Sequence, residues 1–324
     1  MTELSSENTG PKIPRLAILD VARGLAVVAM AIYHLSWDLS WFAIVDWPVS
    51  QGYGWRIFAA CIAGSFLFLA GISLDLAHHN AIGWRSFLKR EAIIIAAAAT
   101  VSAVTFFVFG DSFVRFGILH SIAAASLIAL PFSRLPLVPT IIAAAVFLTL
   151  PQWGAFSFFD GPLWLWTGLG RTGHVSVDYV PVAPWAGVTL TGLAVSQLAR
   201  RTGLWQKLSE YRFEGIAGRV SRVLGRHSLP IYLLHQPVLY GLVWLAASIG
   251  SGADPAEISF IKACTRNCQE TWSDPQICNA ACTCTLTHLK NDGIWLQLNA
   301  EPENQSLRSR MNTHHALCLA DPER

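Results

Sequence analysis

The sequence has little charge. Only 14% of its 324 residues are Asp, Glu, Lys or Arg, whereas 53% are hydrophobic. A water-soluble domain usually carries about 25% charged residues. Apolar runs of roughly 18–20 residues recur along the chain, which is the length that a helix needs to cross a bilayer. The shortage of charge therefore argues against a soluble protein and indicates a polytopic membrane protein whose partner is the lipid bilayer.

The sequence also lacks the short motifs of soluble catalysis. It has no G-x-S-x-G, no Walker phosphate loop and no H-E-x-x-H. These motifs place a serine nucleophile, nucleotide phosphates or a zinc ion. Without them, a pump driven by nucleotide hydrolysis is unsupported, and we expect no metal in the membrane domain. Basic residues are spread over several short loops, so we expect no nucleic-acid partner.

The apolar runs predict an all-α bundle with about seven membrane spans. We place these helices at about residues 16–37, 55–77, 91–109, 115–132, 136–152, 181–199 and 228–249. The aromatic segment 153–170 is apolar enough to cross, but Asp160 and the pair Gly161-Pro162 interrupt it. We interpret it as interfacial or re-entrant; a spanning segment would reverse the last helix.

The distribution of Lys and Arg predicts the orientation. Alternate loops collect most of the basic residues, above all the loop 200–226, and cytoplasmic loops are the ones enriched in Lys and Arg. The chain then divides into a disordered arm (1–14), a membrane domain (15–250) and a tail (251–324). We expect a multi-pass protein of the bacterial inner membrane, with its N-terminus in the cytoplasm and its tail in the periplasm.

The tail is rich in cysteine, with six of the seven cysteines of the chain. Two C-x3-C pairs on helices would each present both sulfur atoms on one face. Nested disulfides would then join the two helices, and the last two cysteines would pair. We predict the disulfides Cys264–Cys282, Cys268–Cys278 and Cys284–Cys318. A zinc site is the alternative in a reducing compartment, whereas disulfides suit the oxidising side of the membrane.

The first apolar helix carries ionisable residues that are costly at membrane depth. Arg23 and His34 are eleven residues apart, which is close to three helical turns, so both lie on one face about 16 Å apart. Asp38 follows His34 by about one turn and could orient its imidazole. Packing of His34, an interfacial Asp38, and an Arg23 that reaches the inner surface or pairs with Asp20 are the simpler alternatives.

Further polar residues lie at the ends of later helices. His120 is predicted at the depth of His34, where it could share a catalytic chamber or only pack. Tyr232 and His235 are one turn apart in the last membrane helix, and Arg226 precedes it. These three residues could meet a phosphate-bearing cofactor from the cytoplasm. Asp178 is a candidate substrate-binding residue, although a solvated loop acid is the simpler interpretation.

Five segments together resemble a known family. They are ILDVARGLAVVAMAIYHLSWDL (18–39), SFLFLAGIS (65–73), FGILHSIA (116–123), DYVPVAPW (178–185) and GRHSLPIYLLHQP (225–237). The chain resembles the membrane acyltransferases that share the catalytic domain of heparan-alpha-glucosaminide N-acetyltransferase, in their short bacterial form. The cysteine-rich tail has no counterpart in the lysosomal enzyme of that family.

The resemblance implies a fold and an activity. It implies a helical membrane domain with a central pore, in which an acetyl group passes from cytoplasmic acetyl-CoA to a hydroxyl or amine of an extracytoplasmic sugar or glycan. By this likeness His34 is the catalytic base or acyl carrier, and Arg23 is either a CoA contact or a structural contact. Two other functions stay open from the residues alone: a proton-coupled small-molecule transporter and a non-catalytic envelope scaffold.

Overall fold

The computed structural model describes residues 16–42, 44–45, 47–49, 52–171, 176–211, 213–251, 254–269 and 274–321. The described residues are helical or irregular, and the one β-type pairing among them is the isolated bridge between Phe116 and Tyr179. This supports the all-α prediction. The predicted N-terminal arm, residues 1–14, lies outside the described residues.

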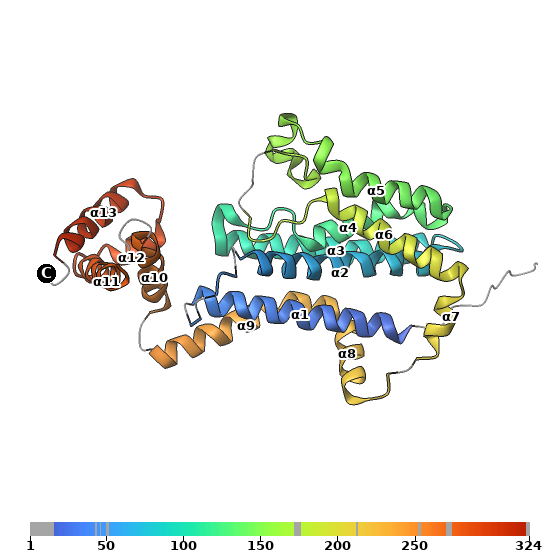
Figure 1. The fold of residues 1–324 in the computed structure, drawn as a ribbon, viewed down its shortest axis with the longest axis horizontal. Helices are drawn as coiled ribbons and strands as arrows, with labels where there is room; N and C mark the ends of the chain where they lie inside the picture. The colour runs from blue at the N-terminus through green and yellow to red at the C-terminus, as the bar shows by residue number, and fades with distance from the viewer. Residues whose placement is uncertain are drawn as a thin grey trace, which may run out of the picture. The chain divides into compact units, whose positions relative to one another are not determined.

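Seven apolar helices in the described part of the membrane domain occupy the predicted positions to within a few residues, except that the third begins earlier and the fourth is shorter than expected. They are α1 (Ala17–Trp41), α2 (Tyr53–His78), α3 (Trp84–Phe109), α4 (Ile118–Ala129), α5 (Leu137–Trp153), α6 (Val182–Arg201) and α9 (Ser228–Ser251) (Figure 1). Within the described residues, α1, α2, α3, α6 and α9 are long and apolar enough to span a membrane. Helices α4 and α5 have 12 and 17 residues. At about 1.5 Å per residue α4 is shorter than the ~30 Å hydrocarbon core, so seven full spans stay a prediction.

The aromatic segment after α5 forms no spanning helix. Two short 3-10 segments, Ser157–Asp160 and Pro162–Thr167, occupy it. Gly161 and Pro162 separate them, and proline cannot continue a preceding helix because it lacks the N–H group and its ring is bulky. The structure thus agrees with the non-spanning interpretation of this segment.

The chain forms two compact units. The first contains residues 16–33 and 56–235 of the described chain, and the second contains 34–55 and the residues from 236 onward. The divisions fall inside α1, between Tyr33 and His34, and inside α9, between His235 and Gln236. The predicted boundary at residue 250 falls inside the second unit.

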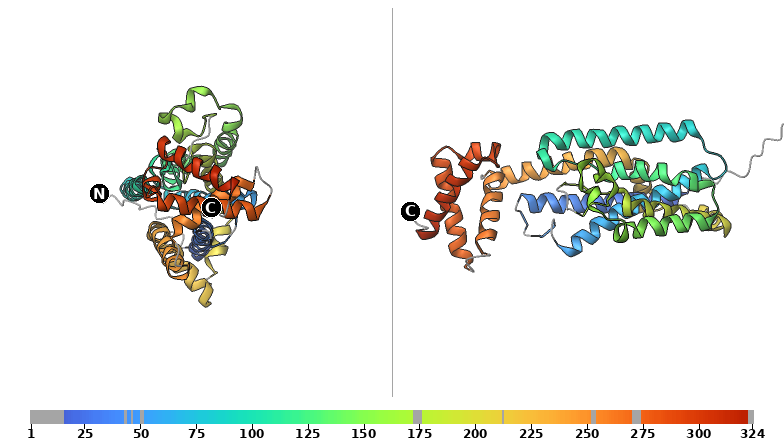
Figure 2. Two further views of the ribbon diagram at one scale, coloured as in Figure 1. Left: turned by 90° about the vertical axis from the view of Figure 1, so that its left-hand side faces the viewer. Right: turned by 90° about the horizontal axis from the view of Figure 1, so that it is seen from above.

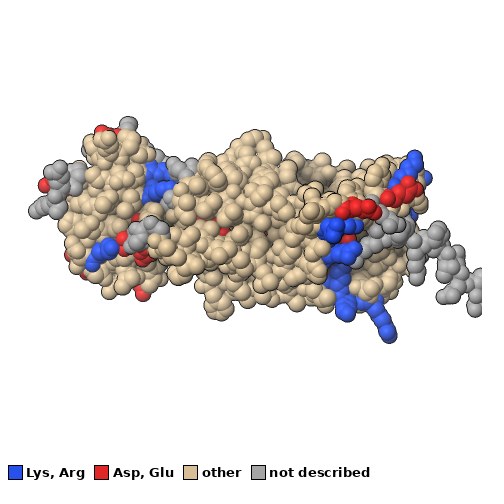
Figure 3. All heavy atoms as spheres, turned by 90° about the horizontal axis from the view of Figure 1, so that it is seen from below, with Lys and Arg blue, Asp and Glu red and all other residues tan. Residues whose placement is uncertain are grey.

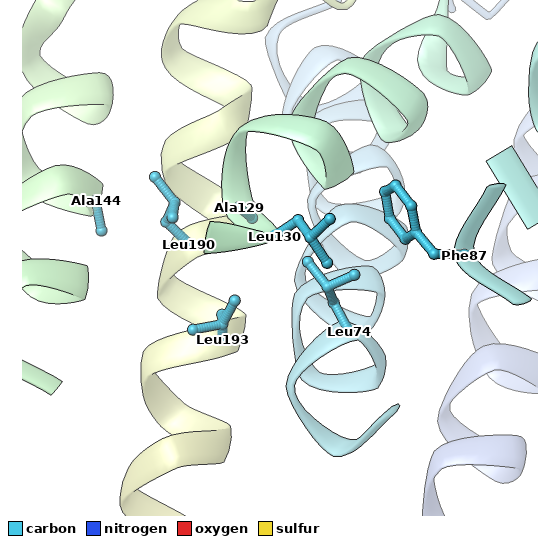
Figure 4. Packing of buried hydrophobic residues seen from close by; sticks show 7 residues of the cluster. All are labelled: Leu74, Phe87, Ala129, Leu130, Ala144, Leu190 and Leu193. Carbon is cyan, nitrogen blue, oxygen red and sulfur yellow. The ribbon is translucent and has the colours of Figure 1, made fainter. Parts of the chain in front are cut away.

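Helix α6 is the centre of the first unit. Two thirds of its apolar stretch is buried, the largest share among the candidate spans described, and it contacts both α4 and α5. Leucines of α6 pack with residues of α2 to α5 in a cluster that Figure 4 shows from close by: Leu74, Phe87, Ala129, Leu130, Ala144, Leu190 and Leu193. Burial of this apolar surface fixes α6 in the bundle, and Asp178 lies just before the start of α6.

Glycines allow α2 and α6 to approach each other closely. A Cβ atom on Gly71 would collide with the Thr189 carbonyl oxygen, and one on Gly192 would collide with the Phe68 carbonyl oxygen. The contact is therefore backbone to backbone on both sides. Small residues commonly allow such close packing between membrane helices. Helices in lipid gain no hydrophobic free energy by associating, so close van der Waals contact has to hold them together.

The tail contains four helices within the second unit. They are α10 (Pro255–Gln269), α11 (Pro275–Asn291), α12 (Trp295–Ala300) and α13 (Gln305–Ala320). Asp274 and Asn304 accept hydrogen bonds from the first backbone N–H groups of α11 and α13, as N-cap residues do. The sequence predicted the first two helices but not α12 and α13.

Three disulfides staple the described tail helices, in the pairs that the cysteine spacing predicts. Cys264–Cys282 and Cys268–Cys278 are the nested pair between α10 and α11, and Cys284–Cys318 joins α11 to α13. Small domains with limited cores commonly depend on such links. His315 lies 3.8 Å from the Cys264 sulfur, but this cysteine is oxidised here and is not a free ligand.

Candidate functional site

Two arginines share one buried carboxylate at the start of α1. Asp20 is 2% exposed. Its Oδ1 lies 3.4 Å from Nη1 of Arg23, and its Oδ2 lies 3.4 Å from Nε of Arg226 at the end of α8 (Ile216–Arg226). Arg23 also donates to the hydroxyl of Ser73 on α2. Two guanidinium groups thus lie at one carboxylate within the described residues, and guanidinium groups are the side chains that bind carboxylates and phosphates in two-pronged contacts.

Close backbone contact brings α8 to this point. A Cβ atom on Gly24 would collide with the Ser221 carbonyl oxygen, and one on Gly225 would collide with the Asp20 carbonyl oxygen. Both glycines are therefore required by the crossing of α8 over α1. The sequence suggested a pairing of Arg23 with Asp20, but it did not indicate that Arg226 joins the same carboxylate.

A second pair of charges in the first unit is built differently. Asp75 on α2 is fully buried and receives hydrogen bonds from Arg200 of α6 at 2.9 and 2.7 Å. Ser196 donates to the same carboxylate at 2.6 Å, and the Trp205 indole donates to Ser196 at 3.2 Å. This short, two-pronged arrangement satisfies Asp75 completely, which is typical of a structural ion pair. Sequence reasoning did not single out Asp75, because its partner is 125 residues away.

Asp38, in the second unit, is a buried acid one turn after His34 on α1. It is 0% exposed, and its Oδ1 accepts a hydrogen bond from the Gln236 side chain of α9 at 2.9 Å. Its Oδ2 has no partner among the described residues. His34 is partly buried. Asp38 is thus held inside the protein rather than at an exposed helix end, and its proposed orienting role toward His34 stays a prediction.

His120 has a local structural role. Its Nδ1 accepts from the Gly117 N–H at 3.3 Å and so caps the start of α4. Its Nε2 lies 3.4 Å from the Ser102 hydroxyl, which itself donates to the Val114 carbonyl, so the Nε2–H tautomer satisfies every group. Both ring nitrogens are thus used in packing α3 against α4. The predicted catalytic role of His120 stays untested, and this geometry favours the packing alternative.

Asp178, which is 60 residues from Ile118 in the sequence, also caps the N-terminus of α4. Its Oδ2 accepts from the Ile118 N–H at 3.0 Å, and Gly117 leaves the space in which the carboxylate sits. A carboxylate at a helix N-terminus is favoured by the helix dipole. Its negative charge also acts on the phenol groups of Tyr33 and Tyr232. Asp178 is therefore a partly buried, ordered acid rather than a solvated loop residue.

The pKa of Asp178 can be tested through the pH dependence of protein stability. Burial raises its pKa from 3.8 to about 6, against the opposing effect of the Ile118 hydrogen bond. The folded state then binds the proton more tightly than the unfolded chain, so the contribution of this group to stability falls as pH rises from about 4 to about 6. Asp178→Asn keeps the acceptor oxygen and removes the titration. We expect it to raise stability at pH 7.5, by an amount of the order of 1 kcal/mol, and to weaken the pH dependence.

Thermal unfolding of the detergent-purified protein at pH 5 and pH 7.5 measures both effects. Asp111→Asn, a change at an exposed acid, is the matched control. Lower stability of the Asp178→Asn protein than of the wild type at pH 7.5 would mean that attraction to the helix dipole outweighs the burial cost.

Tyr232 and His235 lie in the part of α9 that belongs to the first unit. Tyr232 packs among apolar residues of α1, α2 and α4. His235 Nδ1 is 2.7 Å from the Tyr232 carbonyl oxygen, and the two rings are 5.7 Å apart. Both side chains are therefore part of the packed bundle. The structure does not bring them to the Asp20 cluster, so their predicted cofactor contact stays a prediction.

These features define a class of protein. It is a helical membrane protein with charged groups buried on its first helix. The comparison with family models then identifies the family. The chain belongs to the heparan-alpha-glucosaminide N-acetyltransferase catalytic-domain family, whose model matches residues 15–237, or 223 of the 324 residues. The match includes the Asp20 cluster, His34, Asp38, His120, Asp178 and most of the polar segment of α9, and it ends before the tail. No curated protein matches the chain, and no solved structure matches it either.

Proposed function

We propose that this chain is an integral-membrane acetyltransferase that transfers the acetyl group of acetyl-CoA to a hydroxyl or amine of an extracytoplasmic sugar or glycan. Membership of the family carries this proposal. The buried ionisable residues on α1 support it, because charged groups in membrane helices are costly and generally functional. The donor and the acceptor both follow from the family.

The Asp20 cluster is the best candidate for the donor phosphates. Its contacts of 3.4 Å are longer and weaker than the 2.7–2.9 Å contacts between Arg200 and Asp75. The Arg226 side chain is also half exposed. The half-exposed Arg226 guanidinium could therefore turn toward a phosphate while Arg23 stays at Asp20, whereas Arg200 cannot leave Asp75 without stranding a buried charge.

His34 is the proposed reacting group. In the simplest step its imidazole takes the proton of the acceptor hydroxyl or amine, whose oxygen or nitrogen attacks the thioester carbonyl of acetyl-CoA. The carbon–sulfur bond breaks, and the CoA thiolate receives the proton from the imidazolium. In a second possible route the imidazole itself attacks the thioester and releases CoA. The acceptor then attacks the acetyl-imidazole, which regenerates His34. In both routes Asp38 would hold the imidazole in the required tautomer.

The charge distribution and the disulfides support one orientation. Disulfides persist on the oxidising side of a membrane, and Lys and Arg accumulate in cytoplasmic loops. We therefore place the α8 region in the cytoplasm, where acetyl-CoA is made, and the tail in the periplasm of the inner membrane.

Donor binding tests the proposal directly. Saturating CoA should raise the thermal midpoint of the purified protein, because a ligand that binds the folded state alone stabilises it by mass action. Arg23→Gln should remove most of this shift, whereas the control Arg308→Gln in the tail should leave it unchanged. An unchanged midpoint of the wild-type protein with CoA and acetyl-CoA would contradict the proposal and favour the transporter.

A further inference from the structure

Helix α8 has an apolar stripe that nothing in the described protein covers. Ile216, Val220 and Val223 follow the i, i+4, i+7 spacing of one helical face, and their exposures are 80%, 51% and 54%. The opposite face carries Ser221 and Gly225, which contact the backbone of α1. At about 100° per residue, the stripe therefore points directly away from α1.

Arginines follow one flank of this stripe. Arg219 and Arg222 lie about 60–120° around the helix from the centre of the apolar face. Neither of them forms an ion pair with any residue that the structure describes. In contrast, Arg226 at the helix end reaches Asp20. Two positive charges of α8 are thus available to an external anion, separately from the donor-site candidate.

The direction of α8 adds an independent observation. Figure 1 shows α8 running crosswise to α1, which is one of the candidate membrane spans, and the left-hand view of Figure 2 shows α1 (blue) nearly end-on with α8 (yellow) extending away from it. A helix that is packed crosswise on a spanning helix runs parallel to the bilayer plane. Figure 3 shows Lys and Arg side chains gathered toward the part of the first unit that carries α7 (Leu204–Ser209) and α8, beside a broad surface without charge.

We infer that α8 is an interfacial helix that binds the headgroups of anionic phospholipids. An amphipathic helix with an apolar face and basic flanking residues lies at the boundary between headgroups and acyl chains. The three aliphatic side chains would enter that boundary, and Arg219 and Arg222 would pair with lipid phosphates. The spans next to α8 are themselves surrounded by lipid. An acidic bilayer surface therefore offers acyl chains to the apolar stripe and phosphates to the arginines that flank it.

The depth of α8 is the first measurement. Val220→Cys and, as a control in the tail, Asn312→Cys are each placed in a Cys61→Ala background and labelled with an environment-sensitive fluorophore. Cys61 is the free cysteine of the described chain, so the disulfide-bonded tail stays unlabelled. In vesicles of phosphatidylcholine and phosphatidylglycerol, nitroxide-labelled lipid should quench the label at position 220 strongly and aqueous iodide should quench it weakly, with the reverse at position 312. Equal iodide quenching at both positions would overturn the inference.

The lipid preference is the second measurement. Native mass spectrometry of the full-length protein, released from mixed micelles, gives the ratio of retained phosphatidylglycerol to phosphatidylcholine. The variant Arg219→Gln/Arg222→Gln should lower this ratio about tenfold, since each arginine at an anionic surface contributes a several-fold preference. The control Arg308→Gln/Arg310→Gln has the same change in net charge and should not lower it.

Two results would reject the lipid assignment. An equal ratio for both double variants would show that Arg219 and Arg222 do not select anionic lipid. Displacement of phosphatidylglycerol by added CoA would instead assign these arginines to the donor site. The thermal midpoints of both double variants should match that of the wild type, because the substituted arginines of α8 have no described partner in the fold.

Discussion

The His34→Ala protein is expected to release CoA from acetyl-CoA at least 100-fold more slowly than the wild type. Removal of a positioned acid–base group typically lowers the rate by about 10²–10⁴-fold. The loss should be similar whether the imidazole acts as a base or carries the acetyl group, because both routes need the same ring nitrogen. Chromatographic quantification of CoA measures the rate without interference from the exposed thiol of Cys61.

Two controls separate chemistry from folding in this experiment. His79→Ala removes an imidazole just after the end of α2 whose Nδ1 lies 3.1 Å from the Asp75 carbonyl oxygen, and it should keep wild-type turnover. The His34→Ala protein should retain the CoA-induced rise in thermal midpoint, because we propose that Arg23 and Arg226, and not His34, bind the donor phosphates. Turnover within a factor of two of the wild type would remove His34 from the mechanism.

The Asp75→Ala substitution is expected to have the largest effect on stability. It leaves the Arg200 guanidinium, 26% exposed, beside a buried cavity and removes the acceptor of Ser196. Breaking one side of a buried ion pair costs about 3 kcal/mol, which corresponds to a fall in thermal midpoint of roughly 5–10 °C. Thermal unfolding in detergent is the measurement, and loss of cooperative unfolding would be the extreme form of the same result.

A surface pair provides the matched control. Arg308 and Glu303 lie 3.1 Å apart with side chains 52% and 84% exposed, so Arg308→Ala should leave the midpoint unchanged within error. Exposed ion pairs contribute little because water and salt screen them. An Asp75→Ala midpoint equal to that of Arg308→Ala would show that water reaches Arg200 and that the pair is not structural.

The positions of the helices could be predicted because apolarity is a local property. A run such as residues 228–249 needs no knowledge of its neighbours to be recognised as a helix, and α9 begins at the predicted residue. The disulfide pairs followed for a similar reason, since a C-x3-C spacing places two sulfur atoms on one helix face. The tail helices α12 and α13 were missed because they are short or polar and lack this periodic signal.

The partners of the buried polar residues could not be predicted in the same way. Arg226 and Asp20 are 206 residues apart, and Asp75 and Arg200 are 125 apart. Which carboxylate meets which guanidinium depends on where glycines let two helix backbones approach, as Gly24 and Gly225 do. His120 illustrates the same limit: the sequence showed an imidazole in an apolar helix, and only the structure showed that Ser102 and Gly117 use both of its nitrogens.

The sequence by itself determined that this protein is a helical membrane protein of an acetyltransferase family with a cysteine-stapled tail, because hydropathy, motif order and cysteine spacing are written along the chain. The tertiary structure decided which of the charged side chains meet one another. Asp75 and Arg200 satisfy each other through short, buried contacts, whereas Arg23 and Arg226 share one carboxylate and Arg219 and Arg222 meet none among the described residues. That distinction depends on distances between helices, which local sequence does not encode.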